Sequence, residues 1–315
     1  MMSDDGYHAS ALGTECFLLG HCRMPSAGAI DIFLSLIDEM DRAASRFRDD
    51  SELNRIFNGA ARKEVAVSEL LFTALEAALR GARITNGYLD PTVAGSLVGL
   101  GYRTDFRSSL ANGASASGDV QVVLPRGYQR VRLNKVNRSV SVAQGVRLDL
   151  GATGKAFLAD LIKCQIETDL SEKVLVNLGG DISASLVDQE ACWPINVTED
   201  LSLDPHSSGQ IIEIAGGGVA TSSTLKRSWK HGTLKLHHIV DPFSGMSSES
   251  AYHSVTVLAG SALDANIAAT GTIAMGPNGS VWLASLGLPA LARSKEHGES
   301  YFGGWQWAGA VGRQA

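Results

Sequence analysis

Residues 173–185, KVLVNLGGDISAS, constrain the fold of this chain more than any other stretch. The apolar run before Gly179 predicts a buried β-strand, and the pair Gly179-Gly180 predicts that the chain bends there. Glycines at such a bend either form a bulge in a sheet or let a ligand approach the backbone. Asp181, directly after the bend, has oxygens that accept hydrogen bonds from a hydroxyl or a ring N–H. The sequence alone favours neither interpretation.

Short stretches of alternating β-branched residues occur on both sides of this segment and predict antiparallel strands. They lie at residues 120–125, 130–134, 139–142, 146–150, 210–216, 234–242 and 253–260. Apolar residues at helical spacing predict helices at 27–46, 68–83, 153–166 and 261–275. The glycine-rich stretch at 216–223, GGGVATSS, is predicted to be a turn. Because these elements do not alternate as βαβ units, their order favours an α+β fold with antiparallel or mixed sheets and flanking helices.

The length of 315 residues suits one large domain or two intimate lobes. We expect a single domain over residues 1–315, made of two such lobes. Small polar residues at 106–119 predict a flexible loop within this domain rather than a linker between domains.

Charge and cysteine usage narrow the classes of partner. The net charge is −6 and no run of lysine or arginine is present, so nucleic acid is a poor candidate partner. The four cysteines are dispersed, as expected for reduced thiols. No apolar run approaches the roughly 18 residues of a membrane span, and the first residues lack the basic start of a secretory signal. We therefore expect a cytoplasmic protein with no membrane partner.

Residues 148–160, LDLGATGKAFLAD, have the pattern of a strand that passes through a small loop into a helix. Backbone N–H groups after Gly151 and the ammonium of Lys155 could together bind an anion such as phosphate. The GxxxxGK[ST] spacing of a Walker A loop is absent. Taken alone, this segment favours the alternative, a tight turn beside a solvated lysine.

The predicted helix at 261–275 carries Asn266 and Thr270 four residues apart and therefore on one face. Their side-chain oxygens could bind a hard cation such as Mg²⁺. Asp264 points about 200° away at helical pitch. A small-residue helix packed closely on a neighbour is the alternative, and from these residues alone it is favoured.

The segment at 234–242, LKLHHIVDP, carries two adjacent histidines. On a strand, His237 and His238 would face opposite sides, so at most one of them faces a given cleft. One of them could act as a general base near neutral pH, and a histidine bonded within a turn is the alternative. The other histidines show no HExxH or similar spacing, which argues against a zinc site.

Together and in this order, these segments resemble the FAD:protein FMN transferase family, also called ApbE. The resemblance runs from about Gly13 to Gly276. The matching segments are DSELNRIFN, GYLDPTVAGSLVGLGY, LDLGATGKAFLAD, VLVNLGGDISA, VATSS with HHIVDPFSG, and SVTVLAGSALDANIAATGTIAMG. The resemblance implies a T-fold-like architecture with FAD in a cleft between two lobes. It also implies Mg²⁺-dependent transfer of FMN from FAD to a Thr or Ser hydroxyl of an acceptor protein, with release of AMP.

Carried over position by position, the resemblance implies His238 as the catalytic base, with Asp241 and Lys155 also in the catalytic site. The residues implied to line FAD are Ser51, Glu52, Asp90, Pro91, Thr92, Lys155, Gly179, Gly180, Asp181, Thr221, Ser222, Ser223 and His238. The residues implied to hold the metal are Gly154, through its carbonyl, Asn266 and Thr270.

The chain departs from the family pattern at the metal. Asn266 stands where the family carries a metal-binding Asp, and an amide oxygen adds no negative charge, so weaker Mg²⁺ binding is expected. Asp264 could compensate if the helix were shifted. Two alternatives therefore stay open: an FAD-binding protein without catalysis, and an Mg²⁺-dependent FAD pyrophosphatase that yields FMN and AMP. The sequence does not identify the acceptor protein or the oligomeric state.

Overall fold

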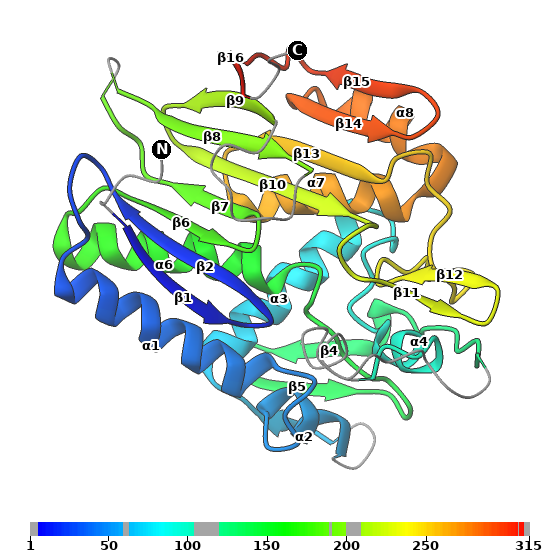
Figure 1. Ribbon diagram of the computed structural model, residues 1–315. Coiled ribbons are helices and arrows are strands. Elements are labelled where there is room, and N and C mark those ends of the chain that lie inside the picture. Colours follow the sequence, from blue (N-terminus) through cyan, green and yellow to red (C-terminus); the bar gives the residue numbers. More distant parts are fainter. Residues whose placement is uncertain are drawn as a thin grey trace.

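An eight-stranded sheet forms the centre of the molecule, and every neighbouring pair of its strands is antiparallel (Figure 1). The computed structural model describes residues 6–58, 63–103, 120–188, 191–199, 209–307 and the backbone of 309–311, and the predicted loop at 106–119 lies outside them. In spatial order the strands are β1 (Gly6–Ala11), β2 (Thr14–Gly20), β6 (Val174–Leu178), β7 (Asp181–Ala184), β10 (Gly217–Ser223), β13 (Ser254–Ala259), β14 (Ala290–Ser294) and β15 (Gly298–Phe302).

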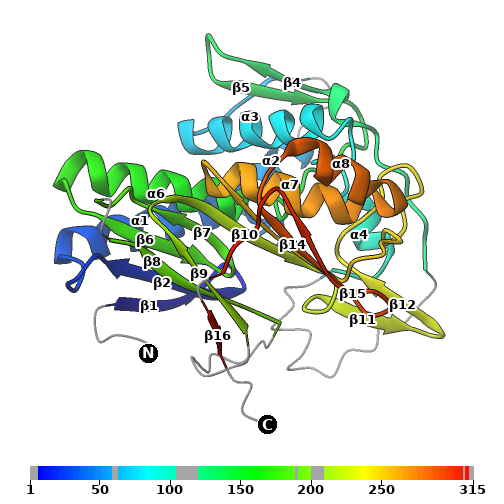
Figure 2. The ribbon, with the colours of Figure 1, turned by 90° about the horizontal axis from the view of Figure 1, so that it is seen from above.

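Helices cover one face of this sheet (Figure 2). α6 (Gly154–Leu170) packs on β6 and β7, and α7 (Ala262–Ala274) packs on β10 and β13. α1 (Ala27–Ala44) and α3 (Glu69–Ile84) contact α6, while α8 (Gly279–Leu286) contacts α7. The four predicted helices are thus confirmed to within a few residues of their ends. The prediction of an α+β fold with antiparallel sheets and flanking helices is also confirmed.

The small residues of α7 explain its close approach to the sheet. Nearly every residue of the helix is buried, and most are Ala, Gly or Thr. At Gly218 of β10, an added Cβ would lie 2.1 Å from the backbone nitrogen of Ala262, so only glycine lets the helix start there. The Asp160 carboxylate of α6 accepts the backbone N–H groups of Ala262 and Leu263, which fixes the start of α7 against α6.

Three smaller sheets complete the architecture. β8 (Trp193–Thr198), β9 (Gly209–Ile214) and β16 (Gly309–Val311) form one of them, and the first two strands share an apolar core with the large sheet. A second contains β3 (Val65–Ala66), β5 (Ser139–Val142) and β4 (Val131–Asn134). The third is the hairpin of β11 (Ser228–His231) and β12 (Leu234–His237), which lies near the short helix α4 (Ala94–Gly99) in Figure 1.

Four local predictions were wrong. Residues 120–125 form no strand, and residues 146–150 contribute only an isolated bridge at Arg147. The stretch at 216–223, predicted to be a turn, is mostly strand β10. Gly218 is required by the approach of α7, which the local sequence does not show. The strand predicted at 234–242 ends at His237, where the chain turns away from its hairpin partner.

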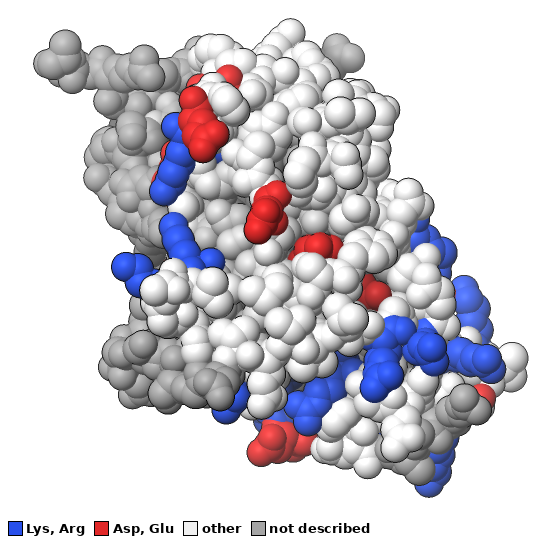
Figure 3. Space-filling view, turned by 90° about the vertical axis from the view of Figure 1, so that its right-hand side faces the viewer, with Lys and Arg blue, Asp and Glu red and all other residues white. Residues whose placement is uncertain are grey.

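Charge is unevenly distributed over the surface. Figure 3 shows lysine and arginine side chains in a band across the lower part of one face, while the acidic side chains are scattered. Exposed arginines of the region around β4 and β5 include Arg126, Arg130, Arg132 and Arg147. Among the described residues, no helix has the length and apolar composition needed to cross a bilayer.

Candidate active site

A cavity of about 880 Å³ opens where β6, β7 and β10 meet the first turns of α6 and the middle of α7. This volume lies toward the upper end of the range for small-molecule sites. The cavity brings together most of the residues singled out from the sequence. Those that line it are Asp90, Pro91, Gly154, Lys155, Gly179, Gly180, Asp181, Thr221, Ser222, Ser223, His238, Asn266 and Thr270.

The double glycine forms a two-residue hairpin turn between β6 and β7, rather than a bulge. Both glycines have positive φ, 70° and 99°, which side-chain-bearing residues rarely adopt. The backbone N–H of Gly180 donates to Asn177 Oδ1 at 2.8 Å. An added Cβ at Gly179 would lie 2.2 Å from Thr14 Oγ1, whereas at Gly180 the nearest atom would be 4.0 Å away. Backbone on the Gly180 side of the turn is therefore open to the cavity.

Asp181 is the centre of a polar network that joins four elements. Its carboxylate is buried and forms an ion pair with Lys155 Nζ at 2.6 Å. Asn266 Nδ2 donates to its other oxygen at 2.8 Å, and Thr270 Oγ1 lies 3.5 Å from Asn266 Oδ1. Ser222 Oγ of β10 is 2.5 Å from the Thr270 hydroxyl. Residues from α6, β7, β10 and α7 thus hold one another in fixed positions at the floor of the cavity.

The oxygen atoms near Asn266 are of the kind that binds a hard divalent cation. Asn266 Oδ1, the Thr270 hydroxyl and the Asp181 carboxylate are hard oxygen donors of the type that Mg²⁺ takes. Asp181 is already neutralised by Lys155, and the described residues contain no group of three or more His, Cys, Asp or Glu side chains that could hold a metal. These oxygens therefore suit a hard cation, but they provide little negative charge to bind it.

Asp264 does not join this set. Its side chain forms an ion pair with Arg80 at 2.6 Å, and 40% of it is exposed. The compensation by Asp264 considered from the sequence is therefore not seen in the structure.

The two histidines occupy different environments. His238 lines the cavity, and its backbone N–H donates to the Arg227 carbonyl at 3.1 Å. His237 is outside the cavity lining, and its ring contacts the Ser248 carbonyl at 3.1 Å. Burial lowers the pKa of His238 well below 6.5, and the positive charges of Arg227 and Lys155 lower it further. His238 is therefore an uncharged imidazole at neutral pH, which is the form that accepts a proton.

Asp241 shapes the turn that follows His238 and is outside the cavity lining. Its Oδ1 accepts the backbone N–H of Phe243 at 3.0 Å, and its carbonyl accepts that of Gly245 at 2.8 Å. The carboxylate thus fixes the turn at 241–245, and through it the end of the segment that carries His238.

Ser51, Glu52 and Thr92 also lie outside the cavity lining, where they support its walls. The Ser51 hydroxyl accepts the Asn54 N–H at the start of α2 (Glu52–Asn58), and the Glu52 carboxylate accepts the Ser68 N–H at the start of α3. The Thr92 hydroxyl and N–H both donate to Asp90 Oδ1. Burial raises the pKa of Asp90 in spite of these bonds.

Sequence reasoning missed a buried ion pair in the wall of the cavity. Arg46 Nε lies 2.7 Å from Asp149 Oδ2, and both side chains are about nine-tenths buried. The guanidinium also donates to the Tyr102 carbonyl and stacks on the rings of Phe47 and Tyr102. Arg46 stands just before the DSEL motif, and no spacing signal relates it to Asp149.

The basic pair Lys226-Arg227, which also lines the cavity, was missed as well. Thr224 and Leu225 separate the pair from the end of β10, so its only signal in the sequence is two adjacent cations shortly after the VATSS motif.

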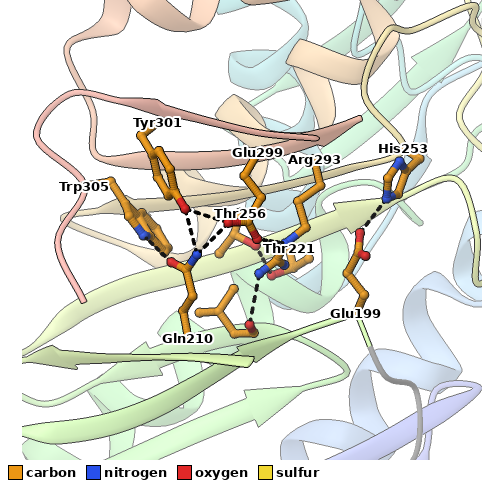
Figure 4. A network of polar contacts seen from close by, with 10 residues as sticks. Glu199, Gln210, Thr221, His253, Thr256, Arg293, Glu299, Tyr301 and Trp305 are labelled. Carbon is orange, nitrogen blue, oxygen red and sulfur yellow. Dashed lines mark hydrogen bonds and ion pairs between the residues drawn. The ribbon is translucent and has the colours of Figure 1, made fainter. Parts of the chain in front are cut away.

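A second polar network braces the outer wall of the cavity, where β8 meets the large sheet (Figure 4). Thr221 Oγ1 of β10 is 2.9 Å from Thr256 Oγ1 of β13, and His253 Nε2 is 2.5 Å from Glu199 Oε1. Arg293 of β14 binds Glu299 and donates to the Val197 carbonyl of β8. Since Thr221 and Glu199 line the cavity, these contacts fix the position of that wall.

Comparisons with known proteins agree over most of the chain. The model of the ApbE family matches residues 8–292. A curated FAD:protein FMN transferase of Treponema pallidum is 28% identical over 288 residues, which cover 84% of this chain and 77% of that protein. One from Vibrio cholerae is 27% identical over 243 residues, which cover 76% of this chain and 71% of that protein.

Solved structures show the same fold. The crystal structure of the ApbE protein of Thermotoga maritima superposes with a TM-score of 0.76 at 22% identity, covering 94% of this chain and 96% of that one. The flavin transferase ApbE of Vibrio cholerae superposes with a TM-score of 0.73 at 23% identity, covering the same shares.

Proposed function

The chain belongs to the ApbE family, and on this premise we propose that it is an FAD:protein FMN transferase. In this reaction a Thr or Ser hydroxyl of an acceptor protein attacks the phosphorus of the FMN half of FAD. A new P–O bond forms to the acceptor, the bond to the AMP phosphate breaks, and AMP leaves. One observation carries the proposal: an uncharged histidine, a lysine and a set of hard oxygen donors converge in one cavity.

His238 is suited to act as the base. Its depressed pKa keeps the imidazole uncharged, so it can take the proton of the attacking hydroxyl. When FAD occupies the cavity, the negative pyrophosphate favours the imidazolium, which makes His238 a stronger base in the complex. Its hydrogen-bonded backbone keeps the ring at the cavity wall.

Lys155 and the hairpin turn are suited to bind the phosphates. The Lys155 ammonium is held by Asp181 and has 18% of its side chain exposed, so it faces the cavity from a fixed position. A fixed cation stabilises the charge that develops on the departing AMP phosphate. The open backbone at Gly180 provides room for a phosphate or ribose to approach.

We further propose that Mg²⁺ assists this reaction. Gly154, Asn266 and Thr270 would hold it, and it would neutralise charge on the pyrophosphate when bound. The neutral amide of Asn266 gives weaker binding than a carboxylate would.

The test is transfer of flavin to a protein acceptor. The protein is incubated with FAD, Mg²⁺ and a candidate acceptor, and flavin fluorescence is measured on the denatured acceptor. We expect fluorescence with the wild type, a loss of about 10²-fold to 10⁴-fold in rate with His238→Ala, and little loss with the matched control His237→Ala.

A parallel incubation without acceptor separates the alternatives. AMP and free FMN formed at the same rate without acceptor would favour a pyrophosphatase. Bound FAD that is neither transferred nor cleaved, with any of several candidate acceptors, would favour a binding protein.

A further inference from the structure

Two cations that the reaction described above does not use lie side by side at the cavity. Lys226 and Arg227 follow β10 after two intervening residues, and both line the cavity. Their segment is fixed on both sides, because the Thr224 N–H donates to the His253 carbonyl at 2.9 Å and the Arg227 carbonyl accepts the His238 N–H. The pair is therefore part of the framework that carries His238.

Lys226 lies in a crowded, positively charged environment. Surrounding protein atoms lower its pKa, and the charges of Lys155 and Arg227 lower it further, while Asp181 acts in the opposite direction. Yet the side chain of Lys226 remains accessible to solvent. Because Lys226 also lines the cavity, its accessible side chain is available to a ligand bound there.

Few carboxylates balance these cations. Of the three neighbouring basic residues, only Lys155 has an ion-pair partner among the described residues, namely Asp181. The other acidic side chains that line the cavity are engaged elsewhere, as in the pairs Glu15 with His8, Asp41 with Arg48, Asp149 with Arg46 and Glu199 with His253, and in the Asp90 turn. Three cations thus surround one carboxylate, and such an excess favours an anionic ligand.

This excess stands beside a metal site with little negative charge. Asn266 contributes an uncharged amide rather than a carboxylate, so a cation is expected to bind there more weakly. A weakly bound cation supplies less positive charge to the ligand. Cleavage of a pyrophosphate requires positive charge from some source, and a lysine can provide it as a point charge.

We propose that Lys226 binds the pyrophosphate of FAD and supplies positive charge to it, so that this chain binds FAD without Mg²⁺. The inference rests on the proposed function only in taking FAD as the ligand. Arg227 contributes to the same excess of charge, and its backbone also supports His238, which makes Lys226 the cleaner position to test.

The experiment measures FAD affinity in EDTA by quenching of flavin fluorescence, with riboflavin as a probe that has no phosphates. We expect Lys226→Met to weaken FAD binding by about tenfold or more, as for loss of a charged contact, and to leave riboflavin binding unchanged. Lys226→Arg should keep FAD affinity within a few fold. Lys230→Met, an exposed lysine of β11, is the matched control and should change neither affinity.

Three results would overturn the inference. These are an FAD affinity unchanged by Lys226→Met, an equal loss for riboflavin, or no FAD binding by the wild type in EDTA. A wild type that binds FAD in EDTA but never transfers FMN would instead contradict the proposed function, and the Lys226 comparison would still decide this inference.

Discussion

At the scale of single residues, the site depends on which protonation state each group keeps. His238 is crowded by protein atoms and near two cations, so its pKa lies well below 6.5 and the free protein holds it uncharged. His237, one residue earlier, also has a lowered pKa through burial, but its ring is bonded to the Ser248 carbonyl outside the cavity. Position rather than residue type therefore separates the proposed base, His238, from its neighbour His237.

The pH dependence of transfer follows from this state. A base must be unprotonated, so activity falls as pH drops through its pKa, and a lowered pKa moves that fall to lower pH. We predict that the acidic limb of kcat/KM lies below pH 6.5. The limb of kcat should lie at higher pH, because bound pyrophosphate raises the pKa of His238. Steady-state rates between about pH 5 and 8 measure both limbs. An acidic limb of kcat/KM above pH 6.5 would contradict the assignment.

A second prediction at this scale concerns Asn266. Its amide nitrogen donates to Asp181, so Asn266→Asp replaces a hydrogen bond with two facing carboxylates. We expect the thermal midpoint of this variant to fall in EDTA and to rise with Mg²⁺ by more than that of the wild type, because a bound cation would screen the repulsion. Scanning fluorimetry with and without Mg²⁺ measures the difference. Equal responses of the two proteins to Mg²⁺ would argue against a cation at this position.

At the scale of elements, the turn between β6 and β7 couples the fold to the site. Gly179 and Gly180 both have positive φ, yet only Gly179 is pressed against another side chain. The turn thus meets two demands at once: it reverses the chain next to Thr14, and it leaves the Gly180 side free.

The two glycines therefore differ in their tolerance of a side chain. We predict that Gly179→Ala lowers the free energy of unfolding by about 2–4 kcal/mol, from backbone strain together with the clash at Thr14. Gly180→Ala introduces only the backbone strain and should lower the free energy of unfolding by about 1–2 kcal/mol. Urea unfolding measures both values, and Thr14→Gly should recover part of the loss in Gly179→Ala. A larger loss at Gly180 than at Gly179 would be inconsistent with this packing.

Much of the element level was predictable from the sequence, and the exceptions have physical reasons. The helices at 27–46 and 68–83 have clear apolar periodicity and serine caps, so local rules suffice. β10 was missed because its glycines look like a turn, although Gly218 is needed only because α7 starts against it. Residues 120–125 alternate like a strand but find no strand partner, and three of them are exposed hydrophobics.

At the scale of the whole molecule, the site is assembled from segments far apart in the chain. Lys155, Asp181 and Asn266 are separated by 26 and 85 residues, yet they form one network. Their order along the chain matched a family pattern, which made these positions predictable. Lys226 and Arg46 lie outside the matching segments. Only the folded chain shows that Lys226 reaches the cavity and that Arg46 forms an ion pair with Asp149 there.

The large sheet and its two covering layers explain why the cavity keeps its shape. α6 and α7 fix the inner wall through Asp160 and Asp181, while the contacts of Arg293 with Glu299 and Val197 attach β8 on the outer side. Figures 1 and 2 show the hairpin of β11 and β12 apart from these layers, near α4. His238 directly follows β12 and lines the cavity, so this residue connects the hairpin of β11 and β12 to the cavity.

Transfer of FMN to a protein hydroxyl is tested by the intact mass of an acceptor protein after incubation with FAD and Mg²⁺, with AMP measured in the same sample. We predict that the acceptor gains the mass of one FMN less one water for each AMP released, and that His238→Ala slows both changes by about 10²-fold to 10⁴-fold. AMP released with no gain in acceptor mass, or a gain that survives His238→Ala at the wild-type rate, would contradict it.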